Sequence, residues 1–134
     1  MRSFLFLTFI GLALTFFSFQ KKPKFNLKES IKRGEDVYLM NCLSCHMQNG
    51  EGLEGVYPPV AKSDYMMSDK ARSIREVLYG IKGKITVNQK DYNGEMNGSM
   101  LSDQEVSDVL NYARNSWGNK GEAVTPEEVK AERK

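Results

Sequence analysis

Apolar residues recur on one side of the segment 30–42, at the spacing of an amphipathic helix. The apolar positions are Ile31, Val37, Tyr38 and Leu39. Gly34 interrupts the segment, at a cost of up to about 1 kcal/mol relative to alanine in a helix interior. This glycine is either a tolerated weakness or a point of close approach by another element, and we favour close approach.

A second periodic segment begins at Ser68 or Asp69, either of which can cap a helix, and runs to about Lys82. Its apolar face comprises Ile74, Val77, Leu78 and Ile81. These positions follow the i, i+3, i+4, i+7 spacing of a helix that faces a core. The pattern predicts a helix whose main role is to bury that face.

The third periodic segment begins at Ser102-Asp103-Gln104-Glu105, which has the sequence of a capping box. In that motif the serine side chain accepts from the third helical amide, and the glutamate reaches back to the serine amide. The expected buried face comprises Val106, Val109, Leu110, Ala113 and Trp117. We expect Gly118 to end this helix.

The remaining segments predict loops and short elements. Residues 49–55 are glycine-rich and predict a loop. Residues 84–92 predict a short hairpin, and Asn93-Gly94 predicts a further turn. Near the end of the chain, Thr125-Pro126 predicts a short helix with threonine as its cap and proline at its first position. We expect this charged tail, residues 119–134, to be peripheral.

The composition limits the classes of function. A chain of 134 residues is long enough for one domain with a modest core. Its 19 lysine and arginine residues are nearly offset by 17 acidic residues, which gives a formal net charge of +2. Nucleic-acid binding requires a concentrated basic surface. We therefore expect no nucleic-acid partner.

The N-terminus carries the pattern of an export signal. Arg2 precedes an uncharged run over residues 4–19, which Lys21 and Lys22 follow. We expect an export signal over residues 1–20 that is removed, followed by a leader over residues 21–29. Retention as a membrane anchor is the alternative, although this run falls just short of the roughly 20 residues that span a bilayer. Association with a membrane could also come from a partner complex.

The motif Cys42-Leu43-Ser44-Cys45-His46 contains both cysteines and the only histidine of the chain. The Cys-x-x-Cys-His spacing is that of c-type haem attachment, in which the two thiols bond the porphyrin and the histidine is the proximal iron ligand. A zinc site would need a fourth ligand. A redox-active dithiol would follow a strand, and a disulfide would leave the histidine unexplained. One covalently attached haem c accounts for all three residues.

Nearby residues indicate how the iron would be held. A proline pair keeps the backbone extended with its carbonyl groups free, so we expect Pro58 or Pro59 to accept a hydrogen bond from the imidazole of His46. The methionines available for the opposite side of the haem are Met66, Met67, Met96 and Met100. We favour Met96, because residues 92–98 are expected to be irregular and able to wrap the haem edge. Met100 is the alternative.

Residues 30–118 resemble the class I, monohaem cytochrome c family of bacteria. The resemblance is carried by residues 31–38 and 41–46 at one end, and by Tyr92-Asn93-Gly94-x-Met96, residues 101–106 and residues 112–119 at the other. It implies an all-α, cytochrome c-like fold of three to four helices wrapped around one haem, with Met96 as an axial ligand. It also implies that the helix containing Gly34 crosses the C-terminal helix near Tyr112. Asn97 stands where relatives commonly have proline, and this departure keeps Met100 as the alternative ligand.

These features predict an electron carrier that has no catalytic residues. An iron with histidine and thioether ligands has little reason to bind a substrate, so we expect it to cycle between Fe(III) and Fe(II) among extracytoplasmic redox partners. The expected compartment is the bacterial periplasm. One alternative is a haem c subunit of a dehydrogenase, nitrite reductase or oxidase complex. Another is a haem protein that binds a small ligand or reacts with peroxide after losing its methionine ligand.

Overall fold

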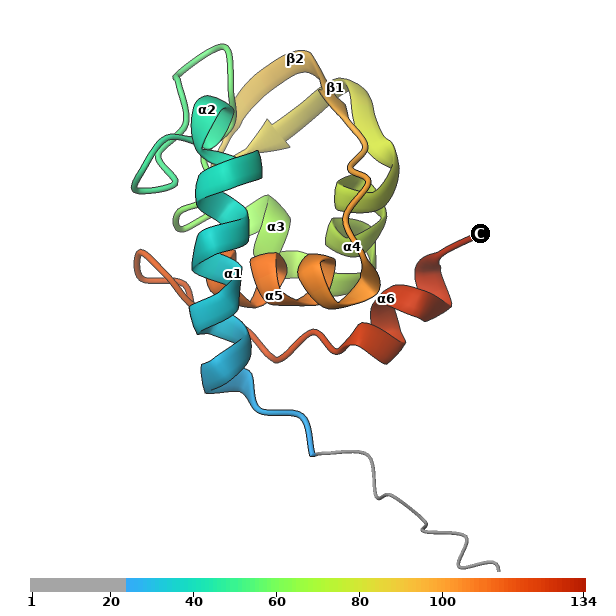
Figure 1. Cartoon of the computed structure of the whole chain (residues 1–134). Coiled ribbons are helices and arrows are strands. Elements are labelled where there is room, and N and C mark those ends of the chain that lie inside the picture. Colours follow the sequence, from blue (N-terminus) through green and yellow to red (C-terminus); the bar gives the residue numbers. More distant parts are fainter. Residues whose placement is uncertain (1–23) are drawn as a thin grey trace, which may run out of the picture.

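Residues 24–134 are described by the computed structural model, and they form six helices and one two-stranded antiparallel sheet (Figure 1). The elements are α1 (Leu27–Asn41), α2 (Leu43–His46), α3 (Asp64–Ser68), α4 (Lys70–Tyr79), β1 (Gly80–Val87), β2 (Lys90–Asn97), α5 (Asp103–Ala113) and α6 (Pro126–Glu132). The described part of the chain is mainly helical, as expected, but it has six helices and a two-stranded sheet instead of an all-α fold with three to four helices. The expected export signal, residues 1–20, lies outside the described residues. Within residues 24–134, no helix has both the length and the apolar character needed to cross a membrane.

Helix α1 confirms the first periodic segment and begins three residues earlier, at Leu27. Its N-cap is Asn26, whose side chain accepts hydrogen bonds from the backbone amides of Lys28 and Glu29 at 3.1 and 3.3 Å. This cap satisfies amide groups that have no partner within the helix. The last residues of the expected leader, 27–29, are therefore helical.

Gly34 lies at the contact between α1 and α5, which cross at a steep angle (Figure 1). A Cβ atom at position 34 would overlap the carbonyl oxygen of Asp108 and would lie 2.8 Å from Cβ of Tyr112. The glycine is needed because the two backbones touch here. Both the close approach to Gly34 and the crossing near Tyr112 are confirmed.

A buried carboxylate reinforces this crossing. The Asp108 side chain is 3% exposed, and it accepts hydrogen bonds from Ser30 Oγ at 2.5 Å and from Arg33 Nε at 2.7 Å. Gln104 Nε2 donates to the same carboxylate at 2.9 Å. A charge taken out of water is costly unless it is paired and hydrogen-bonded, and all these donors satisfy that requirement. The ion pair therefore favours one arrangement of α1 on α5.

The hairpin corrects four expectations. Helix α4 ends at Tyr79 instead of near Lys82, because Gly80 takes a positive φ of 82° and starts β1. The hairpin spans 80–97 and turns at Asn88-Gln89, where both φ values are positive, as in the favoured two-residue hairpin turns. Asn93-Gly94 does not turn the chain, since Gly94 pairs with Gly83 inside the ladder. The segment around Met96 is therefore regular strand, and Met96 itself pairs with Ile81.

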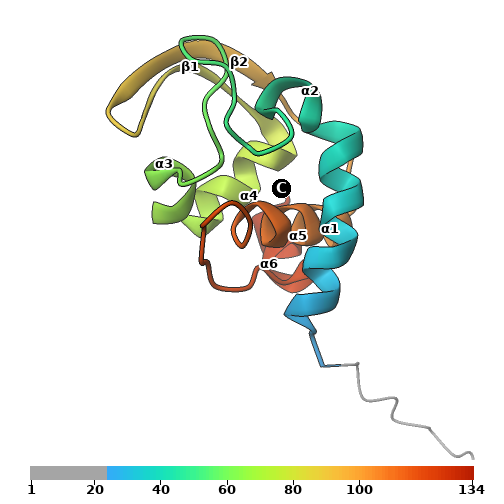
Figure 2. The same ribbon diagram turned by 90° about the vertical axis from the view of Figure 1, so that its left-hand side faces the viewer.

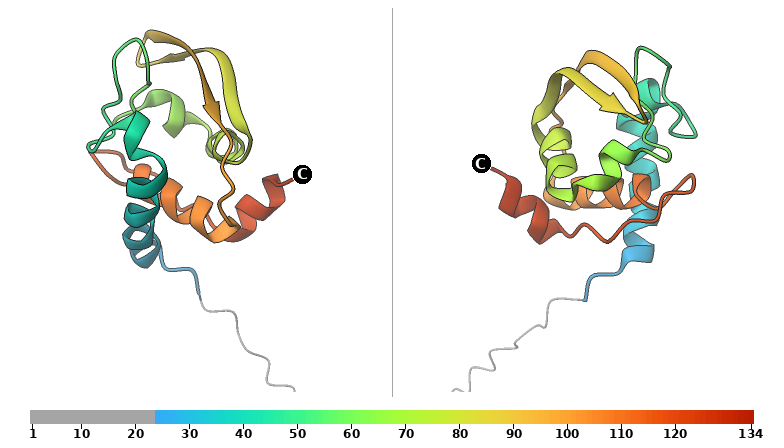
Figure 3. Two further views of the ribbon diagram at one scale, coloured as in Figure 1. Left: turned by 45° about the horizontal axis from the view of Figure 1, so that its top comes forward. Right: turned by 180° about the vertical axis from the view of Figure 1, so that it is seen from behind.

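The C-terminal half of the domain also departs from expectation. The capping box of Ser102 and Glu105 is confirmed, but α5 ends at Ala113, so Trp117 lies beyond it with a φ of 53°. Helix α6 begins where Thr125 caps it, as predicted. Its position is not peripheral: it lies against α4 and α5, at the opposite end of α5 from α1 (Figure 3). Val124 and Val129 have no exposed surface and belong to the core.

We expect Gly34→Ala to destabilise the protein by about 2 kcal/mol or more, because overpacking at a backbone contact outweighs the gain in helix propensity. Asp36→Ala is the matched control, since Asp36 is exposed on the same helix. Thermal and denaturant unfolding of both variants measures the difference. Equal stability of the two variants would contradict the role given to the crossing.

Candidate functional site

The hairpin arches over the space between α1 and α2 on one side and α3 and α4 on the other (Figure 2). A cavity of about 700 Å³ lies beneath it, and some of its lining residues also line a smaller inner pocket of about 120 Å³. The residues that line both are Cys42, His46, Val77, Ile81, Ile85 and Met96. Cys45 also lines the larger cavity. Cofactor sites are commonly mostly apolar clefts of roughly 300–1,000 Å³, so this is the candidate site.

His46 is oriented by the loop that follows it. Its Nδ1 lies 3.0 Å from the carbonyl oxygen of Pro58. Because a carbonyl can only accept, Nδ1 carries the proton and the lone pair is on Nε2. Burial lowers the pKa of His46, against the opposing effect of the Pro58 hydrogen bond, and this favours the neutral ring. The acceptor is Pro58, while Pro59 lines the inner pocket.

The two cysteines lie at the junction of α1 and α2. Cys42 caps α1, Cys45 lies within α2, and both are half-buried and free. Burial, followed by the proximity of Cys45, raises the pKa of the Cys42 thiol to about 11. A redox-active dithiol needs a lowered thiol pKa, so this environment disfavours that interpretation. The described residues contain no cluster of three or more histidine, cysteine or acidic side chains that could hold a metal ion.

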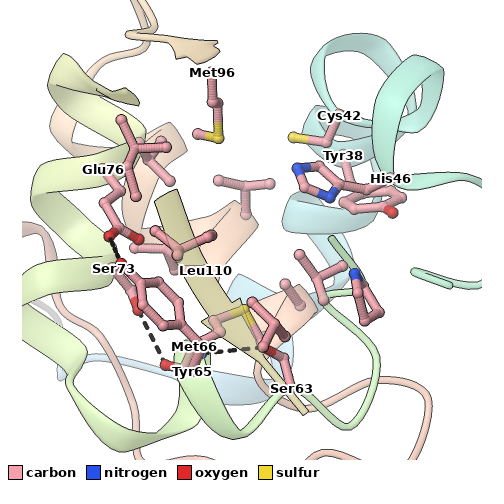
Figure 4. Close-up of a pocket in the computed structure, with 18 residues that line it drawn as sticks. Tyr38, Cys42, His46, Ser63, Tyr65, Met66, Ser73, Glu76, Met96 and Leu110 are labelled. Carbon is pink, nitrogen blue, oxygen red and sulfur yellow. Dashed lines mark hydrogen bonds between the residues drawn. The ribbon is translucent and has the colours of Figure 1, made fainter. Parts of the chain in front are cut away.

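Met96 reaches the site from β2. Figure 4 shows its sulfur facing that of Cys42 across the pocket, with the His46 ring beside Cys42. The alternative, Met100, is fully exposed and does not line either cavity. Met66 is buried and lines only the inner pocket. The structure therefore brings Met96, and not Met100, to the same cavity as the cysteines and the histidine.

The chain holds the loop of residues 47–60 with contacts that the sequence pattern does not indicate. Tyr38, placed on the apolar face of α1, donates its hydroxyl proton to the carbonyl of Met47 at 2.7 Å. Its ring packs against Tyr112 and Trp117 at centroid distances of 5.4 and 5.0 Å. A helical period identifies Tyr38 as buried but does not identify a partner for its hydroxyl. The aromatic cluster links the loop to both crossing helices.

Three lysines on the hairpin pair with acidic residues. The pairs are Lys82–Glu95 at 3.3 Å, Lys84–Asp91 at 2.8 Å and Lys90–Glu54 at 2.5 Å. Glu54 belongs to the glycine-rich loop, so the third pair connects the hairpin to that loop. All six side chains are more than half exposed, and such pairs contribute little to stability.

A covalently attached haem fits the residues that are present. The cavity offers two thiols next to one another in the fold, a neutral imidazole nitrogen, a thioether sulfur facing them and largely aliphatic walls. Thioether and imidazole are established axial ligands of haem iron, and an apolar wall matches the face of a porphyrin.

Comparisons with known proteins agree with this fit. The cytochrome c family model matches residues 31–117. Cytochrome c-552 of Thermus thermophilus is 32% identical over 124 residues, which cover 75% of this chain and 94% of that protein. The cytochrome c subunit of a quinone-dependent alcohol dehydrogenase from Gluconobacter oxydans is 36% identical over 88 residues, which cover 64% of this chain and 18% of the subunit. The cytochrome c subunit of gluconate 2-dehydrogenase from Pantoea cypripedii is 33% identical, with 75% of this chain and 24% of the subunit covered.

The family match spans both sides of the cavity, since it includes the cysteine–histidine motif, the hairpin with Met96 and all of α5. The relative from Thermus extends the likeness over almost the whole length of a small cytochrome. The chain therefore belongs to the cytochrome c family, and it is a class I c-type cytochrome that carries covalently attached haem c and transfers electrons.

Proposed function

We propose that Cys42 and Cys45 would hold the haem covalently and that His46 and Met96 would bind its iron. The observation that carries this proposal is the convergence of all four side chains on one cavity. The cysteines and the histidine come from the end of α1 and from α2, whereas the methionine comes from β2. The bound haem supplies one-electron chemistry between Fe(III) and Fe(II). Met100 is not retained as the ligand, because its side chain is exposed.

The chain's own residues suit a site that changes little between oxidation states. His46 is fixed through Pro58, and Met96 is fixed in a strand that pairs with β1. Ligands on such supports need little movement when the charge of the site changes. The aliphatic walls, with Val77, Ile81 and Ile85, keep water away and favour the less charged state.

We assign an electron carrier rather than an enzyme. An enzyme that uses haem iron needs an open coordination position, and the Met96 sulfur, which points into the cavity, would be available to fill it. The alternative is a haem protein that binds a small ligand or reacts with peroxide. It would require Met96 to move out of the site, although β2 is paired with β1 at eight positions. No catalytic residue is assigned.

We further propose that the protein works outside the cytoplasm, in the bacterial periplasm. The support is the uncharged run over residues 4–19 with flanking basic residues, which is typical of an export signal. Its electron donor and acceptor are proposed to be other redox proteins, which meet it as a free carrier.

A second candidate is a haem subunit of a larger oxidoreductase. The observation that favours it is the similarity to cytochrome c subunits of an alcohol dehydrogenase and a gluconate dehydrogenase. In both relatives the similar part is less than a quarter of the subunit, whereas the Thermus cytochrome is matched along 94% of its length. The free carrier is therefore the first candidate.

Intact mass of the secreted protein tests haem attachment. We expect the wild-type chain, produced in a bacterium with a cytochrome c maturation system, to gain the mass of one haem. The mass also reports whether residues 1–20 were removed. The double variant Cys42→Ser, Cys45→Ser should gain no haem mass, and Ser44→Ala should gain it like the wild type. A colourless wild-type protein with two reactive thiols would refute the proposal.

The methionine ligand is tested by exchanging each candidate for leucine, which conserves volume but cannot coordinate iron. Met96→Leu should lose the sulfur-to-iron charge-transfer band of the oxidised protein. It should also lower the reduction potential by a sizeable part of the roughly 0.8 V over which axial ligands tune haem. Met100→Leu should change neither, because Met100 is exposed. The reverse pattern in the optical spectrum and voltammogram would reassign the ligand.

Affinity purification of the full chain from its own host separates the carrier from the subunit. We expect the free carrier to elute in size-exclusion chromatography at its own mass, without a stoichiometric catalytic chain. A stable, stoichiometric dehydrogenase subunit retained in the same peak would support the second candidate instead.

A further inference from the structure

The segment that orients His46 is fixed on its N-terminal side by Tyr57, whose backbone exchanges two hydrogen bonds with Leu53. Pro58 and Pro59 have no backbone N–H, so neither residue can anchor the segment by donating a hydrogen bond. The backbone amides of Val60 and Ala61 both donate to the carbonyl of Gly50, each at 2.8 Å. These bonds fix one edge of the segment to the glycine-rich loop. The carbonyl of Val60 faces the other way and needs a separate donor.

Asn119 provides that donor. Its side chain is buried at 7% exposure, and its Nδ2 donates to the carbonyl of Val60 at 2.9 Å and to the carbonyl of Ala113 at 2.7 Å. Ala113 is the last residue of α5. One amide group therefore ties the end of α5 to a carbonyl two residues beyond Pro58.

The chain bends back to bring Asn119 to this position. Trp117 and Gly118 have positive φ values of 53° and 92°, and the amide of Asn119 donates to the carbonyl of Ser116 at 2.9 Å. A tryptophan in the left-handed region is an uncommon conformation with an energetic cost. The surrounding contacts stabilise this turn, and its result is the placement of the Asn119 amide.

We propose that Asn119 is a positioning residue for His46. By holding the carbonyl of Val60, it keeps the carbonyl of Pro58 at hydrogen-bond distance from Nδ1, and through that bond it sets the electron-donor strength of the imidazole. This role rests on the proposed function of His46 as an iron ligand. Hydrogen bonding at the second ring nitrogen raises ligand basicity. A stronger donor stabilises the more highly charged oxidation state, so loss of Asn119 raises the reduction potential.

The chain offers a matched control in Asn115. Its Nδ2 donates at 3.0 Å to the carbonyl of Asn111, which belongs to α5 as Ala113 does, and not to a carbonyl of the Pro58 segment. Asn115→Ala and Asn119→Ala each remove a side-chain donor near the same helix end. Only Asn119→Ala removes the connection to Val60.

The experiment compares the two variants as haem-loaded full-length proteins. We expect Asn119→Ala to raise the reduction potential. In the reduced protein, exchange of the His46 Nδ1 proton with solvent, followed by NMR, should accelerate about tenfold, which corresponds to one hydrogen bond to the loop. Asn115→Ala should keep the wild-type potential and exchange rate, although both variants unfold at a lower temperature. If Asn119→Ala does not fold, Asn119→Ser keeps one donor and should show smaller shifts in the same directions.

The proposal would be overturned if Asn119→Ala lowers thermal stability but leaves the reduction potential and the exchange rate unchanged. Asn119 would then only stabilise the end of α5. Where Asn119→Ala does not fold, the same result in Asn119→Ser would overturn the proposal. Failure of the proposed function looks different, because the wild-type protein itself would then lack covalent haem or the charge-transfer band of a methionine ligand.

Discussion

The crossing of α1 and α5 at Gly34 is the constraint on which the site depends. Because the glycine allows backbone contact with Asp108, the position of α1 along α5 is fixed. Cys42, which caps the C-terminal end of α1, therefore lies at the cavity. The buried Asp108 carboxylate and its donors oppose sliding along that contact. The same helix α5 ends where the chain turns back through Trp117. One contact therefore sets the position of the cysteine motif and that of the elements that support its loop.

The cavity lies between two apolar clusters, both of which include residues of α5. On one side, α4, α5 and α6 share a core cluster of Ile74, Leu78, Val106, Leu110, Val124 and Val129. On the other, Val37, Tyr38 and Val109 form a second cluster around the crossing. The hairpin connects to the first side through Gly80 and carries Met96 across the gap. Two packed sides with the hairpin between them frame the cavity in which the haem would be held.

Local signals in the sequence predicted well what depends on local chemistry. The capping box at Ser102 and the threonine cap before Pro126 follow from hydrogen-bonding rules within a few residues. Gly34 was expected to be a point of close approach, because a glycine inside a helix is costly without such a role, but its partner Asp108 lies on a helix that is distant in the sequence. The cysteines and the histidine of the Cys-x-x-Cys-His motif all line one cavity of the structure. Met96 and the carbonyl of Pro58 were also found at the site, although which proline accepts from His46 depends on loop geometry that no local pattern encodes.

The errors arose where a distant partner decides the structure. Ile81 fits a helical period, but its pairing with Met96 places it in a strand. Asn93-Gly94 has the composition of a turn, yet Gly94 is accommodated opposite Gly83 because β1 supplies a complete ladder. Val124 and Val129 look like isolated apolar residues in a charged tail, and only the groove between α4 and α5 makes them part of the core. Asn119 could not be recognised from the sequence, since the carbonyl it holds is 59 residues away.

The paired lysines of the hairpin also affect how the protein meets others in solution. Lys82, Lys84 and Lys90 are balanced locally by Glu95, Asp91 and Glu54, so the three pairs together carry almost no net charge. Their field falls off faster with distance than that of an unpaired basic patch, so these lysines would add little long-range Coulombic attraction toward an acidic redox partner.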